Sequence, residues 1–163
     1  RQADHWKDSV IVTVMRVYME RMRIYRSKLP TSTSAMLTQF VSDACDCGEV
    51  HNSLTVLGIF WDHHETISIL TCHRRPAANQ LIARGFFPCA PYRPSLAVSL
   101  EMLEFATELF ARMAPNNRAF AAATEAVLAA NGSTFQSEDS LWRRFANTLL
   151  HYQILVEEVH AEV

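Results

Sequence analysis

The chain has 163 residues, of which 49% are hydrophobic and 20% charged, and its formal net charge is −2. This length fits one domain with a sizeable core, and the apolar fraction excludes an intrinsically disordered chain. No apolar run reaches the roughly 18 residues that a bilayer requires, and no signal-peptide pattern opens the chain, so the four cysteines are expected to be reduced thiols or metal ligands.

The first predicted element is a helix over residues 8–29. Apolar side chains recur there at steps of three and four residues, and Pro30 ends the run. A polar loop over residues 31–34 is expected to follow. Residues 36–44 are expected to form a strand or an extended segment that leads into the first cysteines.

Two runs rich in β-branched and aromatic residues come next, over residues 54–60 and 66–70. The polar segment 62–65 separates them, and this arrangement predicts a β-hairpin. His63 and His64 fall in the expected turn, where exposure to solvent is favoured over metal binding.

A short helix over residues 77–84 is predicted to end at Gly85. Three prolines within residues 86–94 exclude a helix or a central strand, because each proline lacks a backbone donor. Residues 86–94 are therefore expected to be an extended connection that lies on the core, and Cys89 is expected to be a core residue.

The last part of the chain is predicted to be helical. Ser95 is the expected N-cap of a helix over residues 96–113, Asn117 caps a second helix that ends at Ala130, and Ser137 caps a third. Glu138 and Asp139 fall in the first turn of the third helix, where the helix dipole favours acids. The buried stripe of that helix is expected to comprise Leu141, Phe145, Leu149, Tyr152 and Leu155.

These elements predict an α+β fold. A small antiparallel hairpin or sheet, with a candidate zinc staple, would pack against a mostly helical N-terminal arm and against C-terminal helices. Three segments follow from this division: a helix and loop over residues 1–35, a cysteine-containing β-rich segment over residues 36–94, and a helical region over residues 95–163. Because the chain opens on Arg1 rather than Met, we expect it to be a fragment or a processed product.

One group of residues has the pattern of a metal site. Cys45 and Cys47 form a C-x-C pair whose side chains point the same way in an extended segment, and a hairpin can bring Cys72 beside them. Zinc takes four nitrogen or sulfur ligands, so a fourth is required. The candidates are His51, His63, His64, His73 and Cys89. The alternative interpretation is that these cysteines are ordinary buried apolar residues.

The arginines are unevenly distributed and form two groups, which flank a stretch over residues 29–71 without Lys or Arg. A local basic face of this kind can bind phosphates, although a solvated helix face is the more common reason for such a pattern. The candidate nucleic-acid contacts are Arg16, Arg23, Arg26, Arg74, Arg75 and Arg84.

Sequence motifs of enzymes are absent. The chain has no glycine-rich phosphate loop, no G-x-S-x-G and no H-E-x-x-H, and neighbouring strand residues such as Cys72 and His73 point to opposite faces. Glu101, Glu104 and Glu108 have the spacing of a solvated helix face. No active site and no small-molecule substrate are therefore expected.

A longer set of residues resembles the CxC-type cysteine cluster associated with KDZ (Kyakuja–Dileera–Zisupton) transposases, a family abundant in fungal genomes. The resemblance covers roughly residues 40–152, and its most distinctive part is the segment 80–94, which reads QLIARGFFPCAPYRP. In that family a first C-x-C is followed by a second, and the four cysteines are presumed to bind zinc. Here the position of the last cysteine is Arg74, so His51, His73 or a turn histidine would complete the site, or the metal has been lost.

The resemblance also implies a function. It implies a non-catalytic accessory module that lies upstream of the catalytic domain of a transposase, binds DNA or a protein partner, and acts in the nucleus. The alternative is a structural or protein-interaction module of a decayed transposon copy that holds no metal.

Overall fold

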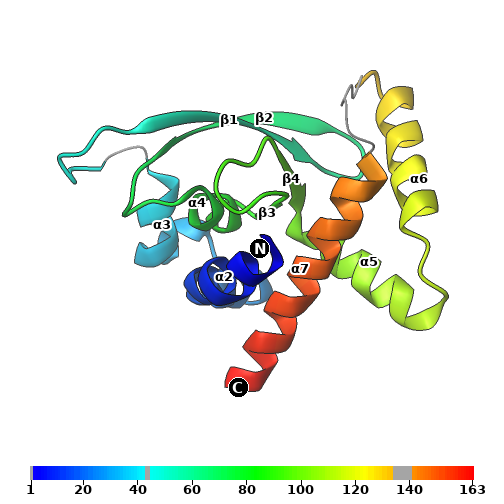
Figure 1. The fold of residues 1–163 in the computed structure, drawn as a ribbon, viewed down its shortest axis with the longest axis horizontal. Helices are drawn as coiled ribbons and strands as arrows, with labels where there is room; N and C mark the ends of the chain where they lie inside the picture. Colours follow the sequence, from blue (N-terminus) through cyan, green and yellow to red (C-terminus); the bar gives the residue numbers. More distant parts are fainter. Residues whose placement is uncertain (1, 43–44, 134–140) are drawn as a thin grey trace.

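The structure, a computed structural model, describes residues 2–42, 45–133 and 141–163. Within these ranges, helices lie against a four-stranded mixed sheet with the strand order β2-β1-β4-β3 (Figure 1). The predicted α+β class is therefore confirmed. No helix in the described ranges has both the length and the hydropathy to cross a membrane.

The N-terminal arm is helical, as predicted, and begins earlier than expected. It comprises α1 (Gln2–His5), a π-helical stretch (Trp6–Ile11) and α2 (Val12–Arg26). Val14, Val17 and Ile24 of α2 are buried in the core, which accounts for the apolar periodicity of this segment.

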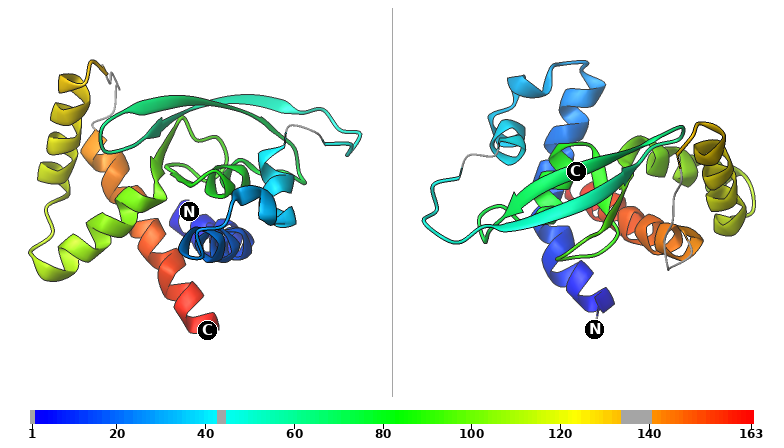
Figure 2. Two further views of the ribbon diagram at one scale, coloured as in Figure 1. Left: turned by 180° about the vertical axis from the view of Figure 1, so that it is seen from behind. Right: turned by 90° about the horizontal axis from the view of Figure 1, so that it is seen from above.

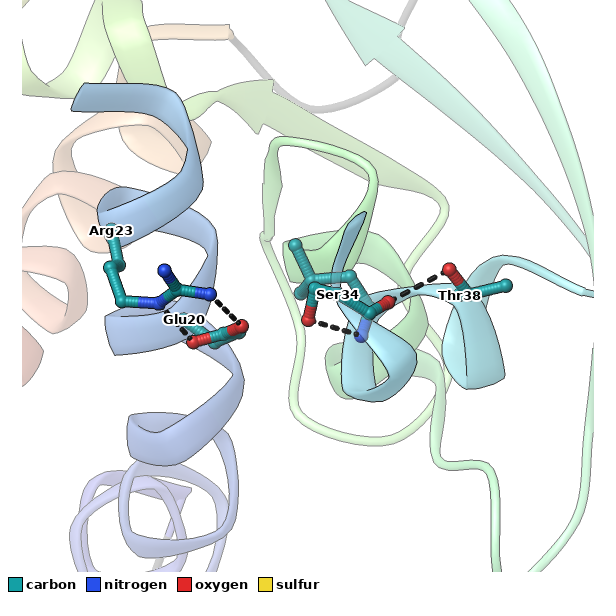
Figure 3. Close-up of polar contacts among 5 residues, drawn as sticks. Glu20, Arg23, Ser34 and Thr38 are labelled. Atoms are coloured by element: carbon teal, nitrogen blue, oxygen red, sulfur yellow. Dashed lines mark hydrogen bonds and ion pairs between the residues drawn. The ribbon is translucent and has the colours of Figure 1, made fainter. Parts of the chain in front are cut away.

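The prediction of a strand or extended segment over residues 36–44 is wrong over residues 36–41, because Ala35–Val41 form a helix, α3, after a short 3₁₀ turn at Thr31–Thr33. Residues 43–44 of that prediction lie outside the described residues. Ser34 caps α3: its Oγ accepts a hydrogen bond from the N–H of Leu37 at 3.3 Å, and its carbonyl accepts one from Thr38 Oγ1 at 2.8 Å (Figure 3). Leu37 is fully buried, so packing against the core adds to the effect of the cap.

The predicted hairpin is confirmed as β1 (Asn52–Ile59) and β2 (His64–Thr71), which pair antiparallel along their whole length. The helix α4 (Ala77–Ala83) follows, and the prolines after it permit only a short edge strand, β3 (Phe86–Pro88). The hairpin arches over α4, and its outer face is not covered by any described element (Figures 1 and 2).

The predicted start of the next helix is wrong. Residues Leu96–Ser99 form β4, a central strand that pairs parallel with β1 and antiparallel with β3. All four residues are buried. Their sequence would also suit a helix, but pairing with β1 and β3 makes this segment a strand. The helix itself, α5, spans Leu100–Arg112 and is capped by Ser99, whose Oγ accepts the N–H of Met102 at 3.2 Å.

The last two helices agree with the prediction except at their starts. The helix α6 (Asn117–Ala130) is capped by Asn116 rather than Asn117. The helix α7 spans Leu141–Glu162, and each residue of its predicted apolar stripe is buried. The expected cap at Ser137, with Glu138 and Asp139, lies outside the described residues.

One core joins the parts of the chain. The main cluster of buried side chains combines the N-terminal helices, β4, α5 and α7, and a smaller cluster fills the space between the hairpin and α4. Because β4 completes the sheet that the hairpin begins, the second and third predicted segments share one sheet. The open end of the hairpin is left projecting at the end of the molecule opposite α6 (Figures 1 and 2).

Candidate metal centre

Four metal-binding side chains come together at the open end of the hairpin. Cys45, Cys47, His51 and Cys72 each offer one ligand atom, and these four atoms lie within 4.8 Å of one another. The first three residues are in the loop before β1, and Cys72 directly follows β2. Antiparallel pairing of Asn52 with Thr71 brings the two ends of the hairpin together and thereby assembles the cluster.

Two distances within the cluster are close to those of tetrahedral coordination. The Sγ atoms of Cys45 and Cys72 are 3.8 Å apart, and Cys47 Sγ lies 3.7 Å from His51 Nε2. Ligands at about 2.3 Å (sulfur) and about 2.0 Å (nitrogen) from one zinc ion, at tetrahedral angles, would be about 3.8 Å and about 3.5 Å apart. These two distances, and the closeness of all four ligand atoms, make the cluster a group that could hold one metal ion.

Backbone N–H groups support two of the thiols. Backbone hydrogen bonds between Cys72 and Arg75 close the turn after Cys72, and the backbone N–H groups of Arg74 and Arg75 lower the pKa of its thiol. The N–H of Glu49 donates to Cys47, and Gly48 between them has a φ of 75° that favours glycine. Such N–H···S bonds orient the sulfur ligands of a metal and stabilise their thiolate form.

The pKa values of these two thiols shift in opposite directions. Burial raises the pKa of Cys72, but hydrogen bonds from Arg74 and Arg75 and from the other two thiols outweigh it, and the net shift is downward. The hydrogen bond from Glu49 lowers the pKa of Cys47, but burial and the neighbouring thiols outweigh it, and the net shift is upward. Cys72 is thus the readier of the two to ionise, and a metal must displace a proton from Cys47.

His73, the other tentative ligand, lies outside the cluster. Its Nδ1 is 2.5 Å from Glu49 Oε2, and its side chain is exposed. Arg74, at the position of the family's last cysteine, is also exposed. The sequence did not decide between His51 and His73 as the fourth ligand. In the structure His51 belongs to the cluster and His73 does not.

The remaining candidate ligands lie elsewhere. His63 and His64 are at the other end of the hairpin, where His63 Nδ1 contacts Asp62 Oδ1 at 2.7 Å. Cys89 packs against the main core and its Sγ accepts a hydrogen bond from Thr148 Oγ1 at 2.9 Å. Burial raises the pKa of Cys89 to about 11, so this thiol stays protonated.

The six candidate arginines divide into two groups. Arg16 and Arg74 are exposed, and Arg26 is exposed with a long contact of 3.9 Å to Glu104. Arg23 donates two hydrogen bonds to Glu20, at 2.8 and 2.9 Å (Figure 3). Hydrogen bonds from Arg23 and Ser34 lower the pKa of Glu20 to about 2, so this ion pair persists at neutral pH.

Arg75 and Arg84 serve the fold instead. Both donate to carbonyls at the C-terminal end of α3: Arg75 to Phe40 and Ser42, and Arg84 to Phe40 and Val41. Arg75 is only 2% exposed. The proposed basic face therefore excludes these two arginines, because their guanidinium groups hold the chain segment that leads to Cys45.

Sequence reasoning missed Glu49, which both donates its N–H to Cys47 and contacts His73. The signal was present as Gly48, since a glycine directly after a ligand cysteine permits the tight turn that such an N–H···S bond needs. The helix-capping role of Arg75 had no signal in the sequence, because it depends on the position of α3.

A comparison with protein-family models matches residues 31–132 to the family described as a CxC1-like cysteine cluster associated with KDZ transposases. The match covers more than half of the chain and includes all four residues of the cluster. The chain therefore belongs to this family, and the resemblance inferred from the sequence is confirmed. No curated protein and no solved structure matches the chain.

Proposed function

We propose that the chain is a zinc-binding, non-catalytic module of a KDZ-type transposase. The observation that carries this proposal is the group of three thiols and one imidazole at tetrahedral spacing. Four protein ligands fill the coordination sphere of zinc, so this geometry is that of a structural site rather than a catalytic one, which keeps an open position.

The metal would join the loop before β1 to the end of β2. Two of its ligands, Cys45 and Cys47, are in a loop without regular secondary structure. A bound zinc ion would therefore fix this loop and link it to the sheet.

Elemental analysis of the purified chain tests the metal directly. We expect about one zinc ion per chain, and much less after Cys47→Ser. Cys89→Ser is the matched control, because it removes a thiol that lies in the core. A zinc content near zero in the unmodified chain would refute the site.

We propose further that the module contacts DNA in the nucleus through Arg16, Arg26 and Arg74. These three guanidinium groups are exposed, and contacts with phosphates would release counterions. Fluorescence anisotropy with duplex DNA should show binding that weakens as salt rises. Replacement of all three arginines with Gln should abolish it, whereas Arg112→Gln, an exposed arginine on α5, should not.

A protein-interaction role is the second candidate. It is favoured by the net charge of −2 and by the loss of Arg75 and Arg84 from the basic face. Binding to duplex DNA that is absent, or that does not depend on salt, would favour this role. Incubation with a DNA duplex and Mg²⁺ should leave the DNA uncut under either function.

A further inference from the structure

The strand β2 has a free edge. It lies at one side of the sheet, and within the described ranges it pairs only with β1. The N–H of Phe60 donates to the carbonyl of His63 at 2.9 Å, and in an antiparallel pair the residues that face the partner alternate. The backbone groups of Glu65, Ile67 and Ile69 therefore bond to β1, and those of Thr66 and Ser68 point outward.

This edge lacks the usual protection against strand addition. Edge strands commonly carry Lys, Pro or a β-bulge, but β2 has neither residue and its register with β1 is continuous. Only one end is covered, where Gln80 Nε2 donates to the outward carbonyl of Leu70 at 2.7 Å. Thr66 and Ser68 are exposed, so no described residue covers this stretch of the edge.

A groove runs along this open stretch. It has a volume of about 580 Å³ and is bounded on one side by Thr66 and Ser68 of β2 and on the other by the ends of α3 and α4. This volume is enough for a few residues of extended chain. The groove thus places the outward backbone groups of β2 beside the ends of α3 and α4.

The far wall carries positive charge. Arg21 and Arg84 line the groove, against a single acid, Glu65. Arg21 is half-buried, and among the described residues it forms no ion pair: its Nη1 makes only long hydrogen bonds, 3.2 Å to Thr31 Oγ1 and 3.4 Å to the carbonyl of Ala83. Gly85 makes room for this guanidinium, because a Cβ there would lie 3.1 Å from Arg21 Nη2.

We propose that this groove binds an extended, acidic peptide segment of a partner protein, which adds as a strand to β2. The peptide backbone would pair with the N–H and carbonyl groups of Thr66 and Ser68, and a Glu or Asp side chain would accept hydrogen bonds from Arg21. This inference goes beyond the proposed metal and DNA functions, and it depends on neither of them.

The probe is an acetylated heptapeptide of alternating Val and Thr with one central Glu, compared with the same peptide carrying Gln. In ¹⁵N-labelled protein, titration with the Glu peptide should shift the amide signals of Thr66 and Ser68. The Gln peptide should bind about tenfold more weakly, as should the Glu peptide with Arg21→Gln protein. Arg112→Gln, at an exposed arginine on α5 that does not line the groove, is the control and should not change the affinity.

Backbone pairing has its own test. Ser68→Pro removes an outward N–H that β1 does not use, and it should abolish binding while the far-ultraviolet circular dichroism spectrum is unchanged. A peptide N-methylated at alternate residues makes the same test without altering the protein. Equal affinity for the Glu and Gln peptides, unimpaired binding of the N-methylated peptide, or no shift at millimolar peptide would overturn the proposal.

Discussion

Individual residues decide what the cysteine cluster can hold. Arg74 stands where a fourth cysteine is expected, but His51 lies on the other side of the cluster and offers Nε2 at 3.7 Å from Cys47. His73 is adjacent to a ligand in sequence, yet its imidazole turns to Glu49. A chain with one ligand replaced thus keeps a complete donor set of three sulfurs and one nitrogen.

The two histidines should therefore respond differently to substitution. His51→Ala removes a ligand, and we expect the affinity for zinc to fall by a factor of 100 or more. His73→Ala should change it by less than tenfold. Titration with Co²⁺, read from its visible absorption and followed by displacement with Zn²⁺, measures both. The interpretation of His51 as the ligand would be wrong if the two variants lost affinity equally.

A second residue-level prediction concerns the basic face. Glu20 holds the guanidinium of Arg23, and because the pKa of Glu20 is about 2, the pair is formed throughout the neutral range. Glu20→Gln would release Arg23 and should raise the affinity for duplex DNA about twofold, with a steeper dependence on salt. Glu108→Gln, which releases Arg112 on α5, is the control and should leave DNA affinity unchanged.

At the scale of the element, the sequence patterns predicted what depends on local chemistry. The hairpin followed from two β-branched runs, and α7 from its apolar stripe. The same reasoning failed for α3 and β4. A short segment such as Leu96–Ser99 suits a helix or a strand equally well, and its position between β1 and β3 decides the outcome.

The cysteines of the metal site could be predicted from the sequence, but its histidine could not. The C-x-C pair and the hairpin indicated that Cys45, Cys47 and Cys72 would meet. The choice among the histidines could not be made, because it depends on the path of the loop over residues 48–51 and on the contact between His73 and Glu49. The roles of Arg75 and Arg84 were unpredictable for the same reason, since α3 was itself mispredicted.

The cap of α3 gives an element-scale prediction. Ser34→Ala removes the side-chain acceptor for the N–H of Leu37, and we expect a loss of about 1 kcal/mol in the free energy of unfolding. Urea denaturation measures it. Ser32→Ala, at an exposed position in the preceding turn, is the control and should change stability by much less. A Ser34 variant as stable as the Ser32 variant would contradict the capping role.

The packing of the hairpin gives a second prediction at the scale of the element. A Cβ at Gly58 would lie 2.7 Å from Phe86 Cε1 and 2.9 Å from Ile67 Cδ1, so this position has no room for a side chain. Gly58→Val should destabilise the fold by about 1–3 kcal/mol through overpacking, measured by thermal or urea unfolding. Ser53→Val, on the uncovered face of the same strand, should have little effect.

At the scale of the whole molecule, the metal cluster and the main core are separate. The cluster lies at the projecting end of the hairpin (Figure 1), whereas the main core is built by the N-terminal helices, β4, α5 and α7, and none of the four cluster residues belongs to it. Removal of zinc should therefore loosen one end of the molecule rather than unfold all of it. Hydrogen exchange after chelation should show faster exchange around residues 45–72 and protection retained in α5 and α7.

The affinity for zinc should also depend on pH. A metal binds thiolates, so protons on Cys47, whose pKa is raised, must leave when zinc enters. Affinity should accordingly rise with pH between 6 and 8, by about tenfold per pH unit for each proton released. Calorimetry in buffers of different ionisation enthalpy counts these protons. An affinity that is constant over this range would contradict thiolate ligation.

The compact placement of the four ligands within residues 45–72 has a consequence for the order of synthesis. The ribosome makes this stretch before β4, α5, α6 and α7, which complete the sheet and supply much of the core. The proposed zinc centre draws its ligands only from the hairpin end and its adjoining loop, so a bound ion would organise this end of a nascent chain before the rest has been translated. The centre would then hold β1 in the register that β4 later joins.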